Sequence, residues 1–405
     1  SLSANPTTQG VSLRAVAPSG AGRALVTLDG VPLNDPFGGW VIWSQVTPEA
    51  LDGLSLVRGA GAGPYGAGAL TGVIALQDGD GGVADLSVGA RGGARAAAAV
   101  GGGRDGMRLT LSGLREVSDG FVPVRGARAG AADTPMDLDV WSLAARADKS
   151  LGAATASLRL AAFEEDRGSG LAGARATARG DVASLTLARS PNRDTLGWRL
   201  QVWRRESDLT NSSVVVSADR STATPSAIQD RTPAVGWGLN AAIRRGGALE
   251  WEFGLDARTA EGETRERFRF MGGQFTRGRV AGGETTVAGV YGEAAWRAGA
   301  WLVAGGLRAD HWENADGRRL ETDLASGSPT LDERDAGRSG QVASARLALR
   351  RELARGWSAR TAAYSSFRPA TLNELHRPFR VGSDLTEANA GLRPERLKGV
   401  EAGLA

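Results

Sequence analysis

The stretch Leu56–Leu76 (LVRGAGAGPYGAGALTGVIAL) contains GAGPYG, which matches the G-x-G-x-x-G pattern of phosphate-binding loops. A dinucleotide site needs a crossover helix after the glycines, and such a crossover takes a dozen or more residues. Only residues 67–72 separate Gly66 from the next apolar run, and no G-K-[ST] follows. We therefore interpret Gly59, Gly66 and Gly72 as glycines of tight turns and close backbone packing, not of a nucleotide site.

Other reactive side chains are too few or too scattered for catalysis. The chain has no cysteine, which excludes disulfides and thiolate chemistry. Its two histidines, His311 and His376, lack the H-E-x-x-H spacing of zinc hydrolases. Asp78 and Asp80 lie in QDGDGG, which lacks the spaced acids and terminal glutamate of a calcium loop. The sequence predicts no enzyme, no resident metal and no cofactor.

The composition narrows the class of protein further. The net charge of the 405 residues is only +3, too small for a nucleic-acid binder. No apolar run approaches the eighteen residues of a membrane-spanning helix, and the N-terminus lacks the features of a signal peptide. A closed β-barrel can cross a bilayer without such a run. Whether the chain is a membrane barrel must therefore be judged from the periodicity of its apolar residues.

Two-residue alternation dominates the chain from about residue 84. In Leu249–Arg258 (LEWEFGLDAR), apolar side chains alternate with polar residues or glycine, as in a strand with two different faces. About fourteen such segments are expected, near 84–91, 94–101, 107–112, 140–148, 153–163, 181–189, 196–203, 235–244, 249–258, 285–296, 299–312, 341–350, 356–365 and 398–405.

The connections between these segments alternate in length. Short ones lie near 149–152, 190–195, 245–247, 297–298 and 351–355; long ones lie near 117–139, 164–180, 204–234, 259–284, 313–340 and 366–397. Short turns at one end and long loops at the other are typical of outer-membrane barrels. We predict a mainly β protein, with a small α+β unit at 1–80 and a transmembrane antiparallel β-barrel at 81–405. A soluble sandwich or solenoid is the structural alternative.

Two segments resemble a known family. Val26–Trp40 (VTLDGVPLNDPFGGW) and the glycine-rich stretch are similar to the D-G-V-P and R-G-P-x-S-x-x-Y-G elements in the plug domain of TonB-dependent outer-membrane receptors. Ser365–Leu404, with SSFRPATLNEL and ANAGLRPERLKGVEAGL, is similar to that family's F-R-A-P-T-x-x-E-L and N-P-x-L-x-P-E segment. The resemblance covers the whole chain, which would hold the second half of a plug and about 14 of the 22 barrel strands.

The resemblance implies energy-coupled import of a scarce, bulky nutrient, such as a ferric siderophore or a cobalamin-like vitamin. It implies a monomeric barrel in the lipid of a Gram-negative outer membrane, and TonB as a partner through a box that lies outside this chain. A passive porin-like channel, a haem-specific member of the family and a soluble sugar- or nucleotide-binding protein are the functional alternatives.

The resemblance also implies site residues. The loop after D-G-V-P would contact the ligand at the plug apex through Asn34, Asp35, Phe37 and Trp40. Arg58 matches the plug arginine that meets barrel glutamates.

Alternation in Val400–Ala405 (VEAGLA) turns Glu401 toward the lumen. We therefore expect an Arg58–Glu401 ion pair, with Glu395 as the second candidate partner of Arg58. His376 lies where haem receptors of this family carry an axial ligand.

Overall fold

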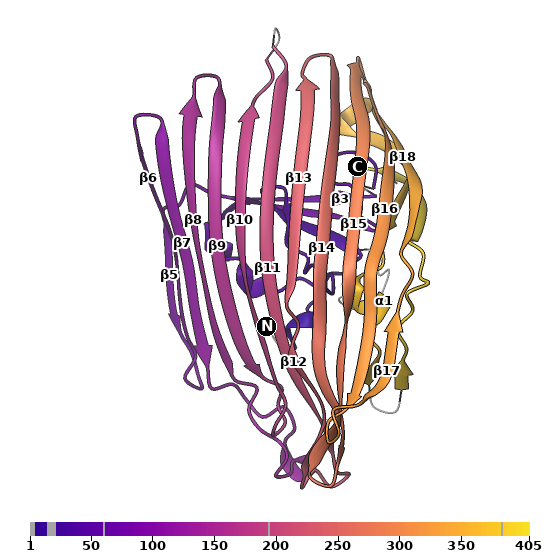
Figure 1. Ribbon diagram of the computed structural model, residues 1–405. Helices are drawn as coiled ribbons and strands as arrows, with labels where there is room; N and C mark the ends of the chain where they lie inside the picture. Colours follow the sequence, from indigo (N-terminus) through magenta and orange to yellow (C-terminus); the bar gives the residue numbers. More distant parts are fainter. Residues whose placement is uncertain (1–4, 14–21, 60, 193–194, 382–383) are drawn as a thin grey trace.

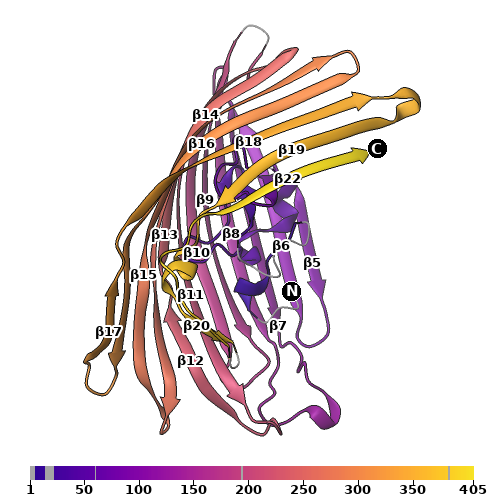
Figure 2. The same ribbon diagram turned by 90° about the vertical axis from the view of Figure 1, so that its right-hand side faces the viewer.

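The computed structural model describes residues 5–13, 22–59, 61–192, 195–381 and 384–405. These residues form a small N-terminal sheet and a large antiparallel sheet that curves around it (Figures 1 and 2). The described part contains no helix long and apolar enough to cross a membrane.

The N-terminal unit, defined here as Ala24–Asp78, has four strands in the order β2-β1-β4-β3. They are β1 (Ala24–Leu28), β2 (Val31–Pro32), β3 (Leu51–Arg58) and β4 (Gly72–Asp78). The 3-10 turns η2 (Trp43–Gln45) and η3 (Pro48–Ala50) connect β2 to β3, and η1 (Pro6–Thr8) precedes the unit. Alternate residues of β1 and β4 pack into two small cores, one around Val26 and Ile74 and one around Leu25 and Val73.

The large sheet, called the wall below, follows a path of fourteen hydrogen-bonded strands from β22 to β5. It consists of β5 (Val83–Val88), β6 (Ala94–Arg104), β7 (Met107–Ser118), β8 (Leu138–Leu151), β9 (Ala154–Gly168), β10 (Arg175–Arg189), β11 (Gly197–Val216), β12 (Ala223–Arg231), β13 (Ala234–Arg245), β14 (Leu249–Met271), β15 (Gln274–Ala298), β16 (Trp301–Asp323), β17 (Pro329–Arg334), β18 (Arg338–Glu352), β19 (Ser358–Arg368) and β22 (Glu395–Leu404). β12 and β13 share one position between β11 and β14, and β17 pairs with β16. The mainly β fold and about fourteen barrel strands were predicted, and both are confirmed.

Short turns lie at the upper end of the wall in Figures 1 and 2, and the long connections lie at the lower end. Two of these connections contain the turn η4 (Gly126–Arg128) and, after β19, the helix α1 (Leu372–His376) with the hairpin β20 (Phe379–Val381) and β21 (Asp384–Thr386). The turn η5 (Ala354–Gly356) connects β18 to β19 at the upper end.

Three predicted long loops are wrong over much of their length. β11 continues to Val216, β16 continues to Asp323, and β14 and β15 form a hairpin that turns only at Gly272–Gly273. The two strands lose their apolar alternation beyond residue 260, so the sequence there looks like a loop. Cross-strand ion pairs such as Arg267–Asp230 and Arg277–Asp323 accompany the ladder in this polar part.

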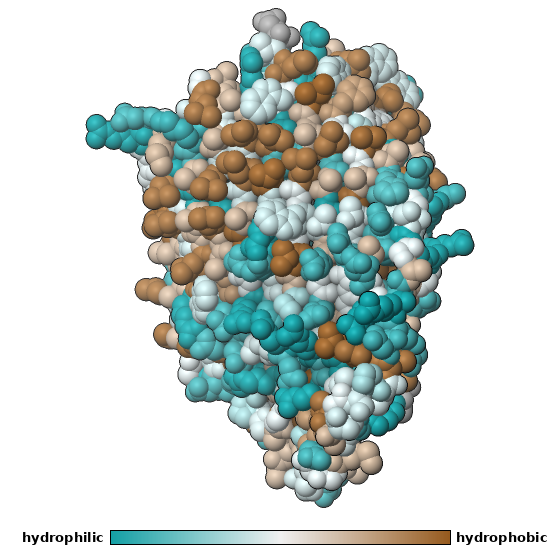
Figure 3. Space-filling view, viewed as in Figure 1, coloured by the Kyte–Doolittle hydropathy of each residue, from teal (hydrophilic) through white to brown (hydrophobic). Residues whose placement is uncertain are grey.

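The outward face of the wall is hydrophobic toward the short turns. Leu249, Phe253 and Leu255 of β14 are all exposed on this face. Figure 3 shows a broad band of hydrophobic side chains across the upper half of the surface and mostly hydrophilic residues below it. The inward face carries polar and charged side chains that contact the N-terminal unit.

Candidate functional site

The glycine-rich segment after β3 lies against arginines of the wall. Arg308 on β16 donates from Nη1 to the carbonyl of Gly63 (3.3 Å), and Arg258 on β14 donates to the carbonyl of Ala67. Gly66 has φ +65°, and a Cβ there would lie 3.0 Å from Nη2 of Arg308. The segment therefore needs glycine both for its backbone angle and for the approach of a guanidinium.

The guanidinium of Arg308 is itself held in place by carboxylates. Its side chain is fully buried and pairs with Asp256 (2.5 Å) and Asp310 (2.6 Å). The two carboxylates neutralise the charge of the buried guanidinium and fix its orientation. The hydrogen bond to Gly63 therefore costs little additional side-chain entropy.

β19 approaches the same segment from the other side. A Cβ on Gly59 (φ +63°) would lie 2.7 Å from the ring of Tyr364, and a Cβ on Gly61 would lie 2.1 Å from Cβ of Ser366. The hydroxyl of Ser366 donates to the carbonyl of Leu70 (2.5 Å). Gly72 (φ +153°) is different, because a Cβ there would meet the carbonyl of Val57 within the N-terminal unit itself.

β11 contacts the turn between β1 and β2. Arg199 and Gln201 both donate to the carbonyl of Asp29, at 2.6 and 3.0 Å. Arg205 donates to the carbonyl of Pro32 (2.5 Å) and to Oε1 of Gln45 (3.0 Å). Four wall arginines, Arg199, Arg205, Arg258 and Arg308, therefore each bind a backbone carbonyl of the N-terminal unit, and Arg205 also binds the side chain of Gln45.

Acidic side chains add a second set of contacts near the end of β4. Arg159 pairs with Asp78 (2.6 Å), and Arg146 pairs with Asp80 (2.9 Å). Asp29 lies beside Asp78, and its Oδ1 accepts a hydrogen bond from the backbone amide of Asp78 (3.3 Å). Burial and then the negative charge of Asp78 raise the pKa of the Asp29 carboxyl to about 6.

An N-terminal arginine does meet a wall glutamate, although it is not the expected one. Arg23 pairs with Glu395 (2.6 Å), which also accepts from Arg368 (2.9 Å). Arg58 is exposed, and among the described residues no ion pair joins it to Glu395 or Glu401. Glu401 lies on the less exposed face of β22, and its pairing with Arg58 stays a prediction.

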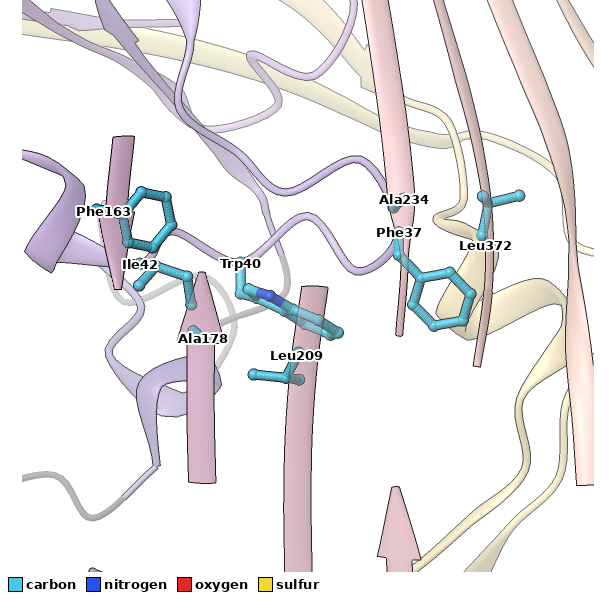
Figure 4. Packing of buried hydrophobic residues seen from close by; sticks show 8 residues of the cluster. All are labelled: Phe37, Trp40, Ile42, Phe163, Ala178, Leu209, Ala234 and Leu372. Atoms are coloured by element: carbon cyan, nitrogen blue, oxygen red, sulfur yellow. The ribbon is translucent and has the colours of Figure 1, made fainter. Parts of the chain in front are cut away.

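The loop between β2 and η2 directs its side chains inward. Phe37 is fully buried and Trp40 is 8% exposed; they join wall residues and Leu372 of α1 in one hydrophobic cluster (Figure 4). Asn34 bonds to backbone groups of Ala24, Val26 and Gly39. Ligand contact by these side chains stays a prediction.

Asp35, the fourth predicted contact residue of this loop, has both carboxylate oxygens occupied. Oδ1 accepts from the amides of Phe37 (2.9 Å) and Gly38 (2.8 Å), and Oδ2 accepts from the hydroxyl of Ser207 (2.6 Å). Burial raises the pKa of this carboxyl above its ordinary value.

His376 is buried at the end of α1. Its Nδ1 lies 2.9 Å from Oδ2 of Asp335, and its Nε2 has no partner among the described residues. The ring packs where a Cβ on Gly283 or Gly317 would touch it, at 3.0 and 2.5 Å. Haem ligation through Nε2 would therefore require α1 to move.

A cavity of about 130 Å³ lies between this inward loop and the wall. Asn34, Asp35 and Pro36 border it on one side. Arg205, Arg258 and Arg368 border it from three different strands of the wall.

These wall arginines were not among the site residues expected from the sequence. Only their positions in the strands indicate an inward direction. Arg258 and Arg308 alternate with apolar residues and so lie on the polar face of their strands.

Family models match most of the chain. The "TonB-dependent Receptor Plug Domain" matches residues 2–73, and the "TonB dependent receptor-like, beta-barrel" matches residues 131–405. The chain therefore belongs to the TonB-dependent receptor family. The N-terminal unit corresponds to the plug and the wall to the barrel, so the predicted family is confirmed. No curated protein matches the chain.

Solved structures share the fold at low sequence identity. The copper transporter OprC is 17% identical, with a TM-score of 0.72 over 95% of this chain and 62% of its own. The ferric yersiniabactin uptake receptor FyuA from Yersinia pestis is 14% identical, with a TM-score of 0.75 over 99% and 64%. The Serratia marcescens hemophore receptor HasR, in complex with HasA and heme, is 17% identical, with a TM-score of 0.69 over 95% and 62%. The chain thus spans somewhat under two thirds of these proteins.

Proposed function

We propose that this chain is part of an outer-membrane receptor that imports a scarce, bulky nutrient, a ferric siderophore or a cobalamin-like molecule, with energy supplied through TonB. Family membership, with a plug and a barrel in one chain, is the observation that carries the proposal. In this function no bond of the cargo is made or broken, which agrees with the absence of a catalytic motif in the sequence.

The contacts between plug and wall suit a plug that is held firmly and released by force. A hydrogen bond from a charged donor contributes about 1.5–3 kcal/mol, and each of four arginines makes at least one to a plug carbonyl. Water can replace each bond separately as the plug is pulled. A force applied at one end would therefore break them in sequence.

The test is uptake by the full-length receptor. A strain that lacks the receptor gene is grown under iron or cobalamin limitation with a panel of siderophores and vitamins, with and without the gene on a plasmid. We expect one ligand to restore growth only when TonB is also present. Equal uptake without TonB would contradict the proposal and favour the passive channel.

The haem-specific alternative has its own readout. Haem added to the purified full-length receptor would give a shifted Soret band that disappears in His376→Ala. An unshifted band, or a shift that persists in His376→Ala, would contradict haem ligation by this residue.

A further inference from the structure

Charges on the outward face of the wall are balanced toward the long connections but not toward the short turns. At the long-connection end, the exposed Arg265 pairs with Glu263 (2.6 Å). Asp208 pairs there with both Arg179 and Arg231, at 3.0 Å each. At the short-turn end, beside the hydrophobic band of Figure 3, the outward charges are mostly basic.

Basic residues recur where wall strands end at a short turn. Six strands in the described part of the wall end in this way, and each has an arginine or lysine among its last three residues: Arg104 on β6, Lys149 on β8, Arg189 on β10, Arg245 on β13, Arg297 on β15 and Arg351 on β18. Arg297 has the strand phase of the inward Glu293, whereas the other five have the phase of exposed apolar residues. Five of the six therefore lie on the outward face.

Two of these five are engaged at the turn between β6 and β7. Arg104 pairs with Asp105 (3.2 Å), and Lys149 donates to the carbonyl of Asp105 (3.0 Å). Their positive charge is therefore partly used within the protein itself.

The other three each lie directly opposite a tryptophan on the next strand of the ladder. The pairs, called the rim below, are Arg189 with Trp198, Arg245 with Trp251, and Arg351 with Trp301. Residues that are directly opposite in an antiparallel pair share a face of the sheet. The guanidinium of Arg351 lies 5.1 Å from the ring centroid of Trp301, within the range of a cation–π interaction.

No carboxylate neutralises the rim arginines within the described part of the chain. None of the three forms an ion pair or a side-chain hydrogen bond there. Glu250, Glu252 and Glu352 are adjacent in sequence to rim residues, so alternation places them on the opposite, inward face. On that face Glu352 pairs with Arg350 (2.7 Å), and Glu252 accepts from the hydroxyl of Tyr291 (2.6 Å). The rim therefore carries three positive charges that are open to an external anion.

The position of the rim indicates which anion it meets. Tryptophan is enriched where the hydrocarbon of a bilayer gives way to its headgroups, and a long arginine side chain can reach from apolar surface to the level of the phosphates. A guanidinium binds a phosphate through parallel, charge-assisted hydrogen bonds. Short turns of outer-membrane barrels face the periplasm, so the rim lies at the headgroups of the periplasmic leaflet.

We propose that the rim binds acidic phospholipids of the periplasmic leaflet, with a headgroup phosphate at each arginine and the tryptophan ring beside the upper acyl chain. The inference rests on the proposed function only for its placement in an outer membrane. A pull on the plug toward the periplasm acts at the same end of the barrel. Lipid bound at the rim would keep the wall at a fixed depth while the plug moves.

Mass spectrometry of the intact receptor–lipid complex tests the proposal. The full-length receptor in uncharged detergent is titrated with phosphatidylglycerol and, separately, with phosphatidylcholine of the same acyl chains. We expect each rim arginine to favour phosphatidylglycerol by about fivefold, as for a basic side chain near an anionic lipid surface.

Two sets of substitutions at the rim separate charge from structure. The glutamine variant combines Arg189→Gln, Arg245→Gln and Arg351→Gln, and it should bind the two lipids equally. The lysine variant combines Arg189→Lys, Arg245→Lys and Arg351→Lys. It keeps the three charges and should still prefer phosphatidylglycerol.

The matched control combines Arg179→Gln, Arg231→Gln and Arg265→Gln. It removes three exposed arginines from the same face at the long-connection end, where they are already paired with carboxylates. Because the rim is intact, the control should keep the lipid preference of the parent.

Four results would overturn the proposal: equal affinity of the parent for the two lipids, a preference that survives in the glutamine variant, its loss in the lysine variant, or an equal loss in the control. None of these results would affect the test of TonB-dependent uptake, so failure of the rim is distinguishable from failure of the proposed function.

Discussion

Gly61 offers a direct test of how the plug is held. Its backbone angle is not left-handed, so alanine is allowed there by conformation. The obstacle is the wall: the new Cβ would lie 2.1 Å from Cβ and 2.4 Å from Cα of Ser366 on β19. Since a Cα cannot rotate away, Gly61→Ala must push plug and wall apart.

The expected cost follows from these contacts. Overpacking of this kind costs about 1–3 kcal/mol. Displacement of Ser366 also weakens its hydrogen bond to the carbonyl of Leu70, which contributes about 1 kcal/mol. The sum, about 2–4 kcal/mol, corresponds to a rise of about 30- to 1,000-fold in the undocked fraction of the plug.

These 405 residues contain no cysteine, so a cysteine introduced here can be labelled selectively once any cysteine elsewhere in the full-length receptor has been replaced by serine. Ser44 lies in η2 against β8 and β9, is 8% exposed, and its hydroxyl has no partner in the described part of the structure. Ser44→Cys therefore gives a buried thiol at little cost. Its reaction with a water-soluble maleimide, measured in the full-length receptor, reports transient undocking.

Gly102→Ala is the control for this measurement. Gly102 lies on β6, its φ is not left-handed, and a Cβ there would meet nothing within 4 Å. The labelling rate should stay within about threefold of the parent, as for an ordinary surface change. A similar rate in Gly61→Ala would refute the view that close backbone approach holds the plug.

Three further predictions use different readouts. The raised pKa of Asp29, about 6, means that its charged form opposes docking above pH 6, so docking strengthens as pH falls from 7.5 to 5. Asp29→Asn should remove this dependence in the labelling assay and gain up to about 3 kcal/mol at pH 7.5. The pKa of Asp133 is lowered to about 2 by its arginine partner on the β11–β12 turn, so this contact is complete above pH 4 and lost toward pH 2. The hydrogen-exchange protection factor of the Gly130 amide, which donates to Asp133, should fall over that interval but stay low throughout in Asp133→Asn. Phe37→Ala should destabilise the buried cluster by about 3–5 kcal/mol and speed exchange at the amide of Asn373, which donates to the carbonyl of residue 37.

The sequence predicted the barrel because alternation is strong wherever one face of a strand is apolar. In Leu249–Arg258 apolar residues alternate throughout with polar residues or glycine, and the structure has strand β14 there. At residues 261–267 both faces are polar, so the pattern that distinguishes strand from loop disappears although the ladder continues to Met271. The predicted segments were therefore right in position and too short.

The site was harder to predict because it depends on pairs that are distant in the chain. The alternation gave the inward direction of Arg258 and Arg308, but nothing in the sequence names their acceptors, which are carbonyls about 190 and 245 residues earlier. A backbone carbonyl can accept a hydrogen bond whatever the residue type, so the sequence does not identify it. Only the glycines beside these carbonyls indicate the contact, because a side chain would not fit there.

That choice of acceptor bears on how such a receptor can change over generations. A carbonyl is present whichever amino acid occupies the position, so Pro32 and Ala67 could be replaced without deleting the groups that the wall arginines bind. The restriction falls instead on Gly61 and Gly66, which must admit wall side chains. Library mutagenesis of the plug should recover several residue types at Pro32, only small residues at the buried Ala67, and glycine alone at Gly61 and Gly66. The plug sequence can therefore change over generations while the hydrogen bonds from the wall arginines to its backbone are kept.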